Sequence, residues 1–252
     1  MRRAALAAAL LLVAAAPTPG AAATSGIRLS ASPVRLTLTG ATGTSITVRN
    51  PGSRPLLVDV SRAGFARSLR GRPRVRAARA AAGWLRLRPR RLRLAPHAAA
   101  TVHVAAHPPR RAEPGDHPAL VLLTTRPVGA GRVRVRLRVG IVVLVRVPGR
   151  IVRRLEPRAL TVRRRGRRRV LDLRLVNRGN VVEQLGGGRL CLVLRHRGRT
   201  VATLRPRRQE LLPRTAGIAE FVYRGRVRGP VVARIELRPR GHGRPRAFRI
   251  HM

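Results

Sequence analysis

The densest group of side chains that could do chemistry in this sequence is a run of arginines around Gly166. Its members are Arg163, Arg164, Arg165, Arg167, Arg168 and Arg169. Guanidinium groups bind phosphate and carboxylate through paired hydrogen bonds, so the run is a candidate contact for a polyanion. The alternative is a solvated hairpin loop in a chain that carries arginine throughout.

The charge of the whole chain points the same way. It has 55 basic residues against 9 acidic ones, a net charge of +46, and every basic residue is arginine. Arginine, alanine, glycine and proline share GC-rich codons, so genome composition accounts for part of the excess. A surface this positive still attracts polyanions, and the predicted partner is a cell-wall polymer or another extracellular polyanion. Nucleic acid is disfavoured as a partner, because aromatic residues for base stacking make up only 2% of the chain.

Residues for catalysis or metal binding are sparse and dispersed. None of the acidic residues forms a close pair in sequence of the kind that glycoside hydrolysis uses. Asp116 lies in the turn Pro114–His117, where we expect its side chain to bond the local backbone. His103, His107 and His117 lack a recognised ligand spacing. We predict a non-enzymatic protein with no catalytic residue, metal site or cofactor; the alternative is a secreted enzyme whose carboxylates meet only in space.

The N-terminus has the features of an export signal. Arg2 and Arg3 precede the apolar stretch Ala4–Ala16, and Ala21–Ala23 offers a small-residue cleavage site, which predicts a signal peptide over residues 1–23. The alternative is an uncleaved anchor. No later segment is long enough to span a membrane, so we expect no transmembrane helix in the mature chain. The predicted location is secreted, or periplasmic within the cell envelope.

One cysteine is present, so an intramolecular disulfide bond is impossible. Cys191 lies between leucines at 190 and 192, a setting typical of a small buried hydrophobic residue. The alternative is a reactive or intermolecular thiol.

The stretch Arg132–Pro148 is the strongest strand in the sequence. Its odd positions are all apolar, which predicts one continuous buried face. Its even positions are arginine at first and later include Val142 and Leu144. We expect these two side chains to pack against a second domain or an adjoining strand. Alternatively, they form a strand edge to which a partner strand adds.

The rest of the chain alternates in short runs separated by Gly and Pro, which predicts an all-β protein of two tandem immunoglobulin-like β-sandwich domains. We place the first domain at 27–148 and the second at 154–252. Residues 63–82 are expected to form a long irregular connection. An internal repeat supports the division, because an alternating strand ends at Asn50-Pro51-Gly52 in one half and at Asn177-Arg178-Gly179 in the other. Leu94-Ala95-Pro96 and Leu211-Leu212-Pro213 then each precede another strand.

Several of these motifs together carry a family resemblance. In chain order they are Ser32-Pro33-Val34-Arg35-Leu36, the Asn50 turn, Trp84-Leu85, Pro114-Gly115-Asp116-His117, Arg138-Val139-Gly140-Ile141 and Val147-Pro148-Gly149. This order resembles the N-terminal, peptidoglycan-binding domain of bacterial WxL-interacting proteins, and the second half is similar to their second immunoglobulin-like domain. More distantly, the chain resembles periplasmic pilus chaperones.

The two resemblances imply different functions. WxL-interacting proteins imply a non-enzymatic cell-envelope protein that contacts peptidoglycan, or another anionic wall polymer, and a surface protein. Pilus chaperones imply an assembly chaperone that acts by strand donation. Their basic clamp, an arginine and a lysine, corresponds to Val34 or Arg35 and to Val142 here, and the chain has no lysine. We therefore expect the first function and keep the chaperone as the alternative.

Overall fold

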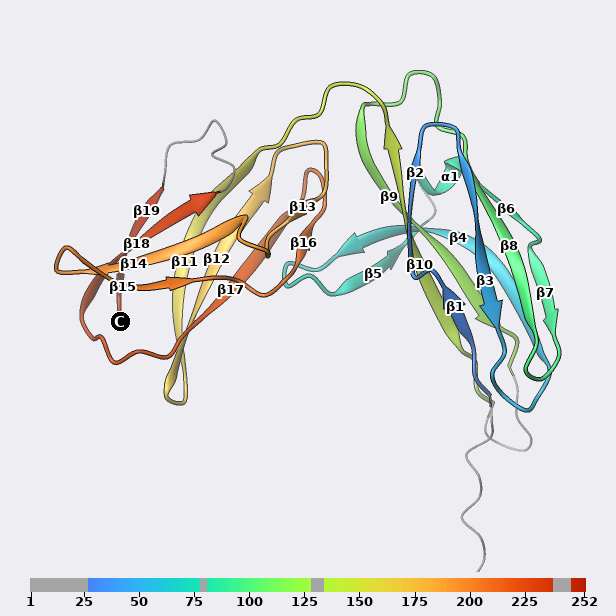
Figure 1. Cartoon of the computed structure of the whole chain (residues 1–252), viewed down its shortest axis with the longest axis horizontal. Helices are drawn as coiled ribbons and strands as arrows, with labels where there is room; N and C mark the ends of the chain where they lie inside the picture. Colours follow the sequence, from blue (N-terminus) through green and yellow to red (C-terminus); the bar gives the residue numbers. More distant parts are fainter. Residues whose placement is uncertain (1–26, 78–80, 128–133, 238–245) are drawn as a thin grey trace, which may run out of the picture.

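The chain forms two β-sandwiches side by side, joined by one linker (Figure 1). The computed structural model describes residues 27–77, 81–127, 134–237 and 246–252. The predicted signal peptide, 1–23, lies outside the described residues. The described chain is almost entirely β-strand, with one helical turn, α1 (Ala81–Trp84), so the predicted all-β, two-domain immunoglobulin-like class is confirmed. No described helix has the length and apolar character needed to cross a membrane.

The first sandwich consists of two sheets. One sheet has the order β1 (Ser30–Ser32), β3 (Gly43–Arg49), β8 (Ala99–Ala106), β6 (Leu85–Arg88). The other has the order β2 (Arg35–Thr39), β10 (Arg138–Val147), β9 (Gly115–Thr125), β4 (Leu56–Arg67), β5 (Pro73–Arg76), with β7 (Arg91–Leu94) also on β4. Alternating side chains of both sheets meet in the core, including the fully buried Ile46, Val48, Leu85 and Leu123.

The second sandwich repeats this plan. One sheet has the order β11 (Leu155–Arg165), β12 (Arg168–Asn177), β17 (Ala216–Tyr223), and the other β15 (Arg199–Leu204), β14 (Leu190–His196), β18 (Pro230–Leu237), β19 (Ala247–His251). A short pair, β13 (Glu183–Gln184) and β16 (Glu210–Leu211), completes it. Leu171, Leu173 and Leu175 on β12 share the buried face that their spacing predicts, and Phe221 packs with them. Cys191 is also buried, which confirms the small-hydrophobe interpretation.

Strand β10 differs from its sequence prediction in length. Strand β10 begins at Arg138, and residues 128–133, which include the first two residues of the predicted strand, lie outside the described chain. The predicted buried face is present, because Ile141, Val143 and Val145 are fully buried in the core. Just before β10, Leu137 O still accepts a hydrogen bond from Thr125 N of β9.

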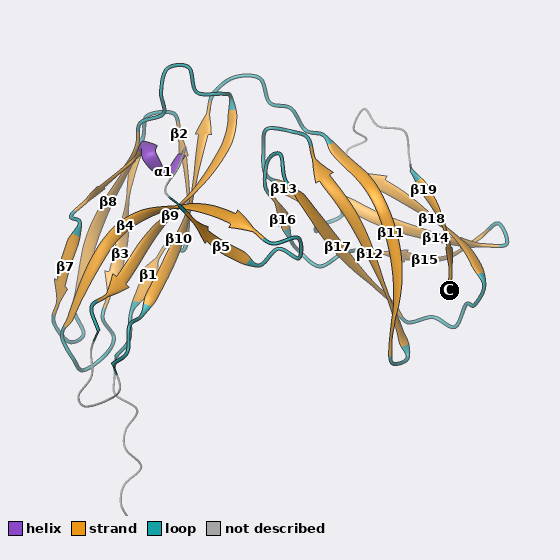
Figure 2. Ribbon diagram, turned by 180° about the vertical axis from the view of Figure 1, so that it is seen from behind, coloured by secondary structure: helices purple, strands orange, loops and turns teal. Residues whose placement is uncertain are grey.

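The irregular connection predicted for 63–82 is wrong. Strand β4 continues to Arg67 and turns back into β5 as a hairpin. The buried side of β4 changes along its length: Val58 and Val60 face the core, whereas Ala63 and Phe65 belong to a separate apolar cluster. This change of side breaks the period of two that identifies a strand in the sequence. Figure 2 shows the β4–β5 hairpin extending from the first sandwich toward β17 of the second.

Candidate functional site at the domain junction and on strand β10

The two sandwiches meet through a small apolar cluster of their own. Ala63, Phe65, Leu120 and Leu122 of the first sandwich pack with Leu212 of the second, and all five are at most 8% exposed. Partly buried Val142 and Val182 pack against this cluster. Val142 therefore faces the junction, which agrees with the expectation that it packs against a second domain. Leu144 is buried as well, with 4% of its surface exposed.

Val142 and Leu144 do not form a free strand edge. Between Val142 and Arg146, β10 pairs with β9 on one side and in parallel with β2 on the other. Both backbone sides of Val142 and Leu144 are therefore occupied, and the partner edge predicted at these residues is corrected. The residues of β2 that pair with β10 lie more than 100 positions earlier in the chain, so local residue spacing does not reveal this pairing.

The free side of β10 lies earlier in the strand. From Arg138 to Gly140, β10 pairs with β9, and no described strand pairs with its other side, because β1 has crossed to the opposite sheet. We call Arg138–Gly140 the open edge. The Val142 amide, an even position, donates to Val34 O of the β2 side, whereas Leu137 O accepts from Thr125 N of β9. Because these directions alternate along a strand, the backbone N–H and C=O groups of Arg138 and Gly140 point away from β9, toward the unpaired side of β10.

Apolar and basic side chains alternate along and before the open edge. Val135 is 37% exposed, and Leu137 and Val139 are half-buried. Val34, where β2 begins to pair with β10, is 69% exposed. Arg134, Arg136 and Arg138 are all exposed. Charges of this kind deter pairing between identical copies, because a second copy brings the same charges.

Arg35, one of the two residues at which the chaperone resemblance puts the clamp arginine, is held by the second sandwich. Its guanidinium donates to Glu210 Oε1, Arg67 donates to Oε2 at 2.9 Å, and Gln184 Nε2 donates to Oε1 at 2.7 Å. Burial raises the pKa of Glu210, but the bonds from Arg35 and Gln184 and the charges of both arginines outweigh burial, so the pKa lies below its ordinary value. Glu210 is thus a charged anchor between the sandwiches, and Arg35 is engaged within the chain.

Asp116 forms the second polar anchor of the junction. Its side chain, 0% exposed, accepts hydrogen bonds from Arg146 Nε at 2.7 Å and Nη2 at 3.0 Å. It also accepts one from Val182 N, across the junction, at 2.8 Å. The hydrogen bonds between Arg146 and Asp116, together with the charge of Asp116, raise the pKa of the Arg146 guanidinium. The predicted bond from Asp116 to its local backbone is therefore corrected to a bond with the second sandwich.

The backbone beside Asp116 comes unusually close to the second sandwich. Asp116 N donates to Asn180 O at 2.7 Å, and Asn180 Nδ2 donates to Pro114 O at 2.8 Å. Gly115 has φ +124°, and a Cβ there would lie 2.2 Å from Asn180 O. Only glycine fits this approach. The motif Pro114–His117 is thus a contact between the two sandwiches.

The β4–β5 hairpin makes the third contact. Leu69 O accepts from Ile218 N at 2.7 Å, and Arg70 donates to Asp172 at 2.9 Å. The hydrogen bond to Asp172 and its charge raise the pKa of Arg70. With the anchors at Glu210 and Asp116, this contact fixes the position of the first sandwich relative to the second.

The basic loop Arg163–Arg169 is the tip of the β11–β12 hairpin. Arg163 pairs with Asp172 at 2.8 Å, and Arg169 Nη1 donates to Val227 O at 2.9 Å. Arg164, Arg165, Arg167 and Arg168 are exposed. The structure therefore divides the predicted cluster into residues that bind within the sandwich and residues that face solvent.

The three histidines do not converge with other ligands. Within the described ranges, no three His, Cys, Asp or Glu side chains are grouped as a metal site. The ring of His117 bonds Glu113 O at 2.7 Å and lies 4.8 Å from the ring of Trp84. Trp84 packs against the core of the first sandwich.

The fold of the whole chain is similar to that of several solved structures. No protein-family model matches the chain, and no curated protein matches it in sequence. A solved chain of the chaperone–tip adhesin complex of CFA/I fimbriae superposes with a TM-score of 0.51 at 9% identity, over 88% of this chain and 98% of that one. The class 5 fimbriae chaperone CfaA superposes with a TM-score of 0.50 at 10% identity, over 89% of this chain and 98% of that one.

The chain shares the two-domain fold of fimbrial chaperones. These likenesses concern the fold alone, because the identities are low. They favour the more distant of the two resemblances in the sequence, and they give no support to the WxL-interacting one or to peptidoglycan binding.

The Glu210 anchor predicts an effect of pH on the junction. Glu210→Gln should lower the free energy of unfolding by about 2 kcal/mol at pH 7, because it removes the charge that two arginines share. The folded pKa of Glu210 lies below the ordinary 4.5, so its contribution is complete above that pH and is lost as pH falls through the folded pKa. The difference between wild type and variant in urea unfolding should therefore shrink in acid.

Glu113→Gln is the matched control for this prediction. Glu113 also pairs across the junction, with Arg214, but its side chain is 51% exposed. Exposed pairs contribute little, so we expect a loss below about 1 kcal/mol. Equal losses in both variants would show that Glu210 is not an anchor.

Proposed function

We propose that this protein is an assembly chaperone of the periplasmic pilus type, which pairs the open edge of β10 with an immunoglobulin-like subunit that lacks a strand. The observation that carries the proposal is the unpaired side of Arg138–Gly140, with Val135 and Leu137 continuing its apolar row. A strand added at such an edge gains backbone hydrogen bonds, and the alternating side chains supply specificity. The fold shared with fimbrial chaperones supports this proposal.

The location and the partner follow from the same argument. The signal-like N-terminus and the chaperone fold support a periplasmic location. The solved structure with the 0.51 TM-score is described as a complex of a chaperone with a tip adhesin, which supports a surface protein as the partner here. The anchored junction supports this role as well, because it holds the two sandwiches in one relation while the open edge stays free.

The mechanism proposed here does not use a two-residue basic clamp. Val142 stands where the resemblance implies a lysine, and Arg35 is paired with Glu210. Subunit binding would therefore rest on the backbone of Arg138 and Gly140 and on the apolar side chains beside them. The variants that test the proposal therefore change the open edge and its apolar side chains, and leave Arg35 unchanged.

Co-expression with a strand-deficient subunit tests the proposal. The probes are pilin-type subunits, each an immunoglobulin-like domain without its last strand, and the readout is a soluble complex in size-exclusion chromatography. Gly140→Pro removes an N–H that points out of the sheet but keeps the pairing with β9, so it should reduce complex formation at least about tenfold. Val135→Asp places a charge in the apolar row and should have a similar effect.

Val232→Asp is the control for these variants. Val232 is 40% exposed on β18 of the second sandwich, away from β10. The control should leave the complex intact, and the melting temperatures of all three variants should match the wild type. Two results would contradict the proposal. One is a complex that forms equally well with Gly140→Pro and with Val135→Asp, and the other is that the wild-type chain forms a complex with none of the subunits.

A further inference from the structure

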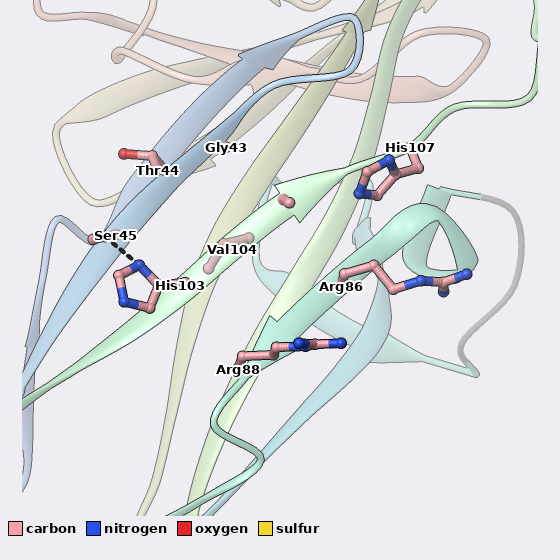
Figure 3. Close-up of a pocket in the computed structure, with 9 residues that line it drawn as sticks. Gly43, Thr44, Ser45, Arg86, Arg88, His103, Val104 and His107 are labelled. Carbon is pink, nitrogen blue, oxygen red and sulfur yellow. Dashed lines mark hydrogen bonds between the residues drawn. The ribbon is translucent and has the colours of Figure 1, made fainter.

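A shallow hollow lies on the outer face of the first sandwich, on the sheet opposite to β10. Its volume is about 630 Å³, and it is lined by residues of β3, β8 and β6 together with His107 (Figure 3). Neither the open edge nor the domain junction takes part in it. An inference about this hollow therefore stands apart from the proposed chaperone function.

The hollow exists because small residues face one another across three strands. Gly43 on β3 is the register partner of Ala105 on β8, and Ala105 is the partner of Arg86 on β6. Directly opposite residues on one face of a sheet lie about 5 Å apart. The row Gly43–Ala105 thus forms a floor with almost no side chains, and Arg86 borders it.

The neighbouring row carries polar groups. Ser45 is the register partner of His103, and His103 is the partner of Arg88. Ser45 Oγ lies within hydrogen-bond distance, 3.0 Å, of His103 Nδ1. This bond orients the imidazole ring and does not involve its other nitrogen, Nε2. Figure 3 shows this bond, and it shows Arg86 and Arg88 extending next to each other from β6.

The cations of the hollow have no carboxylate among their neighbours. The first sandwich contains three acidic residues, and each pairs with an arginine elsewhere: Asp59 with Arg91, Glu113 with Arg214, and Asp116 with Arg146. Arg86 and Arg88 are exposed and point from the same side of one strand. Residues two positions apart share one face of a strand, so one bound polyanion can contact both guanidinium groups.

We propose that this hollow binds an anionic glycan. Arg86 and Arg88 lie next to each other along β6, and the hydrogen-bonding rings of His103 and His107 lie apart from them (Figure 3). This elongated arrangement suits a chain that repeats its negative groups better than a single small anion. Guanidinium groups pair well with carboxylate and sulfate. The exposed hydroxyl group of Ser45 can bond sugar hydroxyls. No Phe, Tyr or Trp side chain is among the residues that line the hollow, so it lacks the large stacking surface that single-stranded nucleic acid uses.

The test is the affinity of the full mature chain for a heparin-derived octasaccharide, measured by calorimetry at physiological salt. The double variant Arg86→Gln, Arg88→Gln should lose at least about tenfold in affinity, since bonds between charged groups are at stake. Ala105→Leu fills the floor without changing charge and should also weaken binding. Unchanged melting temperatures would show that the variants remain folded.

The matched control removes the same charge from the basic loop. Arg165→Gln, Arg167→Gln changes two exposed arginines of the β11–β12 hairpin and should cost less than about threefold in affinity. Equal losses in the two double variants would overturn the site in favour of net charge alone. So would full affinity in Ala105→Leu, no octasaccharide binding by the wild type, or tighter binding of single-stranded DNA through the same residues.

Discussion

Asp116→Ala should lower the free energy of unfolding by about 3 kcal/mol and loosen the two sandwiches from each other. The fully buried carboxylate of Asp116 accepts bonds from Arg146 and from Val182 N of the second sandwich. Breaking a buried ion pair removes about 3–5 kcal/mol. The lower figure applies here because the Arg146 side chain is 41% exposed and can hydrate once its partner is gone.

Urea unfolding measures the loss of stability from Asp116→Ala, and limited proteolysis of the linker between β10 and β11 measures the loosening. Asp59→Ala is the control, because Asp59 pairs with Arg91 on the surface and its side chain is 47% exposed. That variant should lose less than about 1 kcal/mol. If the linker is cleaved at the same rate in both variants, Asp116 does not join the sandwiches.

Asn177→Asp should destabilise the second sandwich by about 3 kcal/mol, and Asn50→Asp should do the same in the first. Each asparagine is 0% exposed. Asn177 Nδ2 donates to Val181 O, Leu211 O and Leu212 O at 2.8–3.2 Å, and its Oδ1 accepts from Gly179 N at 2.9 Å. Aspartate keeps the acceptor, but it removes the donor, leaves buried carbonyls without a partner and buries a charge.

Asn50 makes the equivalent bonds in the first sandwich. Its Nδ2 donates to Arg54 O, Leu94 O and Ala95 O, and its Oδ1 accepts from Gly52 N. Thermal and urea unfolding of the two aspartate variants check the prediction. Thr215→Ala is the control, because it removes one neutral bond, to Leu212 O, and should lose about 1 kcal/mol. An Asn177→Asp variant no less stable than this control would refute the role given to the asparagine.

These asparagines also show what sequence can predict. The repeat pairs Asn50 with Asn177 and Leu94-Ala95 with Leu211-Leu212, and those are the residues whose carbonyls the asparagines hold. Local turn chemistry and a period of two are both encoded within a few residues. For the same reason the buried face of β10, with Ile141, Val143 and Val145, follows from the sequence.

Features that depend on which strands are neighbours did not follow from the sequence. The period of two does not reveal the β4–β5 hairpin, because the buried side of β4 changes where the strand leaves the core for the junction. The apolar even positions Val142 and Leu144 predict a partner edge there, whereas pairing with β2 closes that part of β10 and leaves Arg138–Gly140 open. The hollow beside Arg86 and Arg88 depends on the register of three strands, which residue spacing does not contain.

Hydrogen exchange of the chain with and without a strand-deficient pilin-type subunit tests the central claim most directly. If the subunit adds a strand at the open edge, amide exchange should slow at Arg138 and Gly140 and across residues 134–140, while the hollow on β3, β8 and β6 stays unchanged. Slowing confined to other strands, with exchange at Arg138 and Gly140 as fast as in the free protein, would contradict the account.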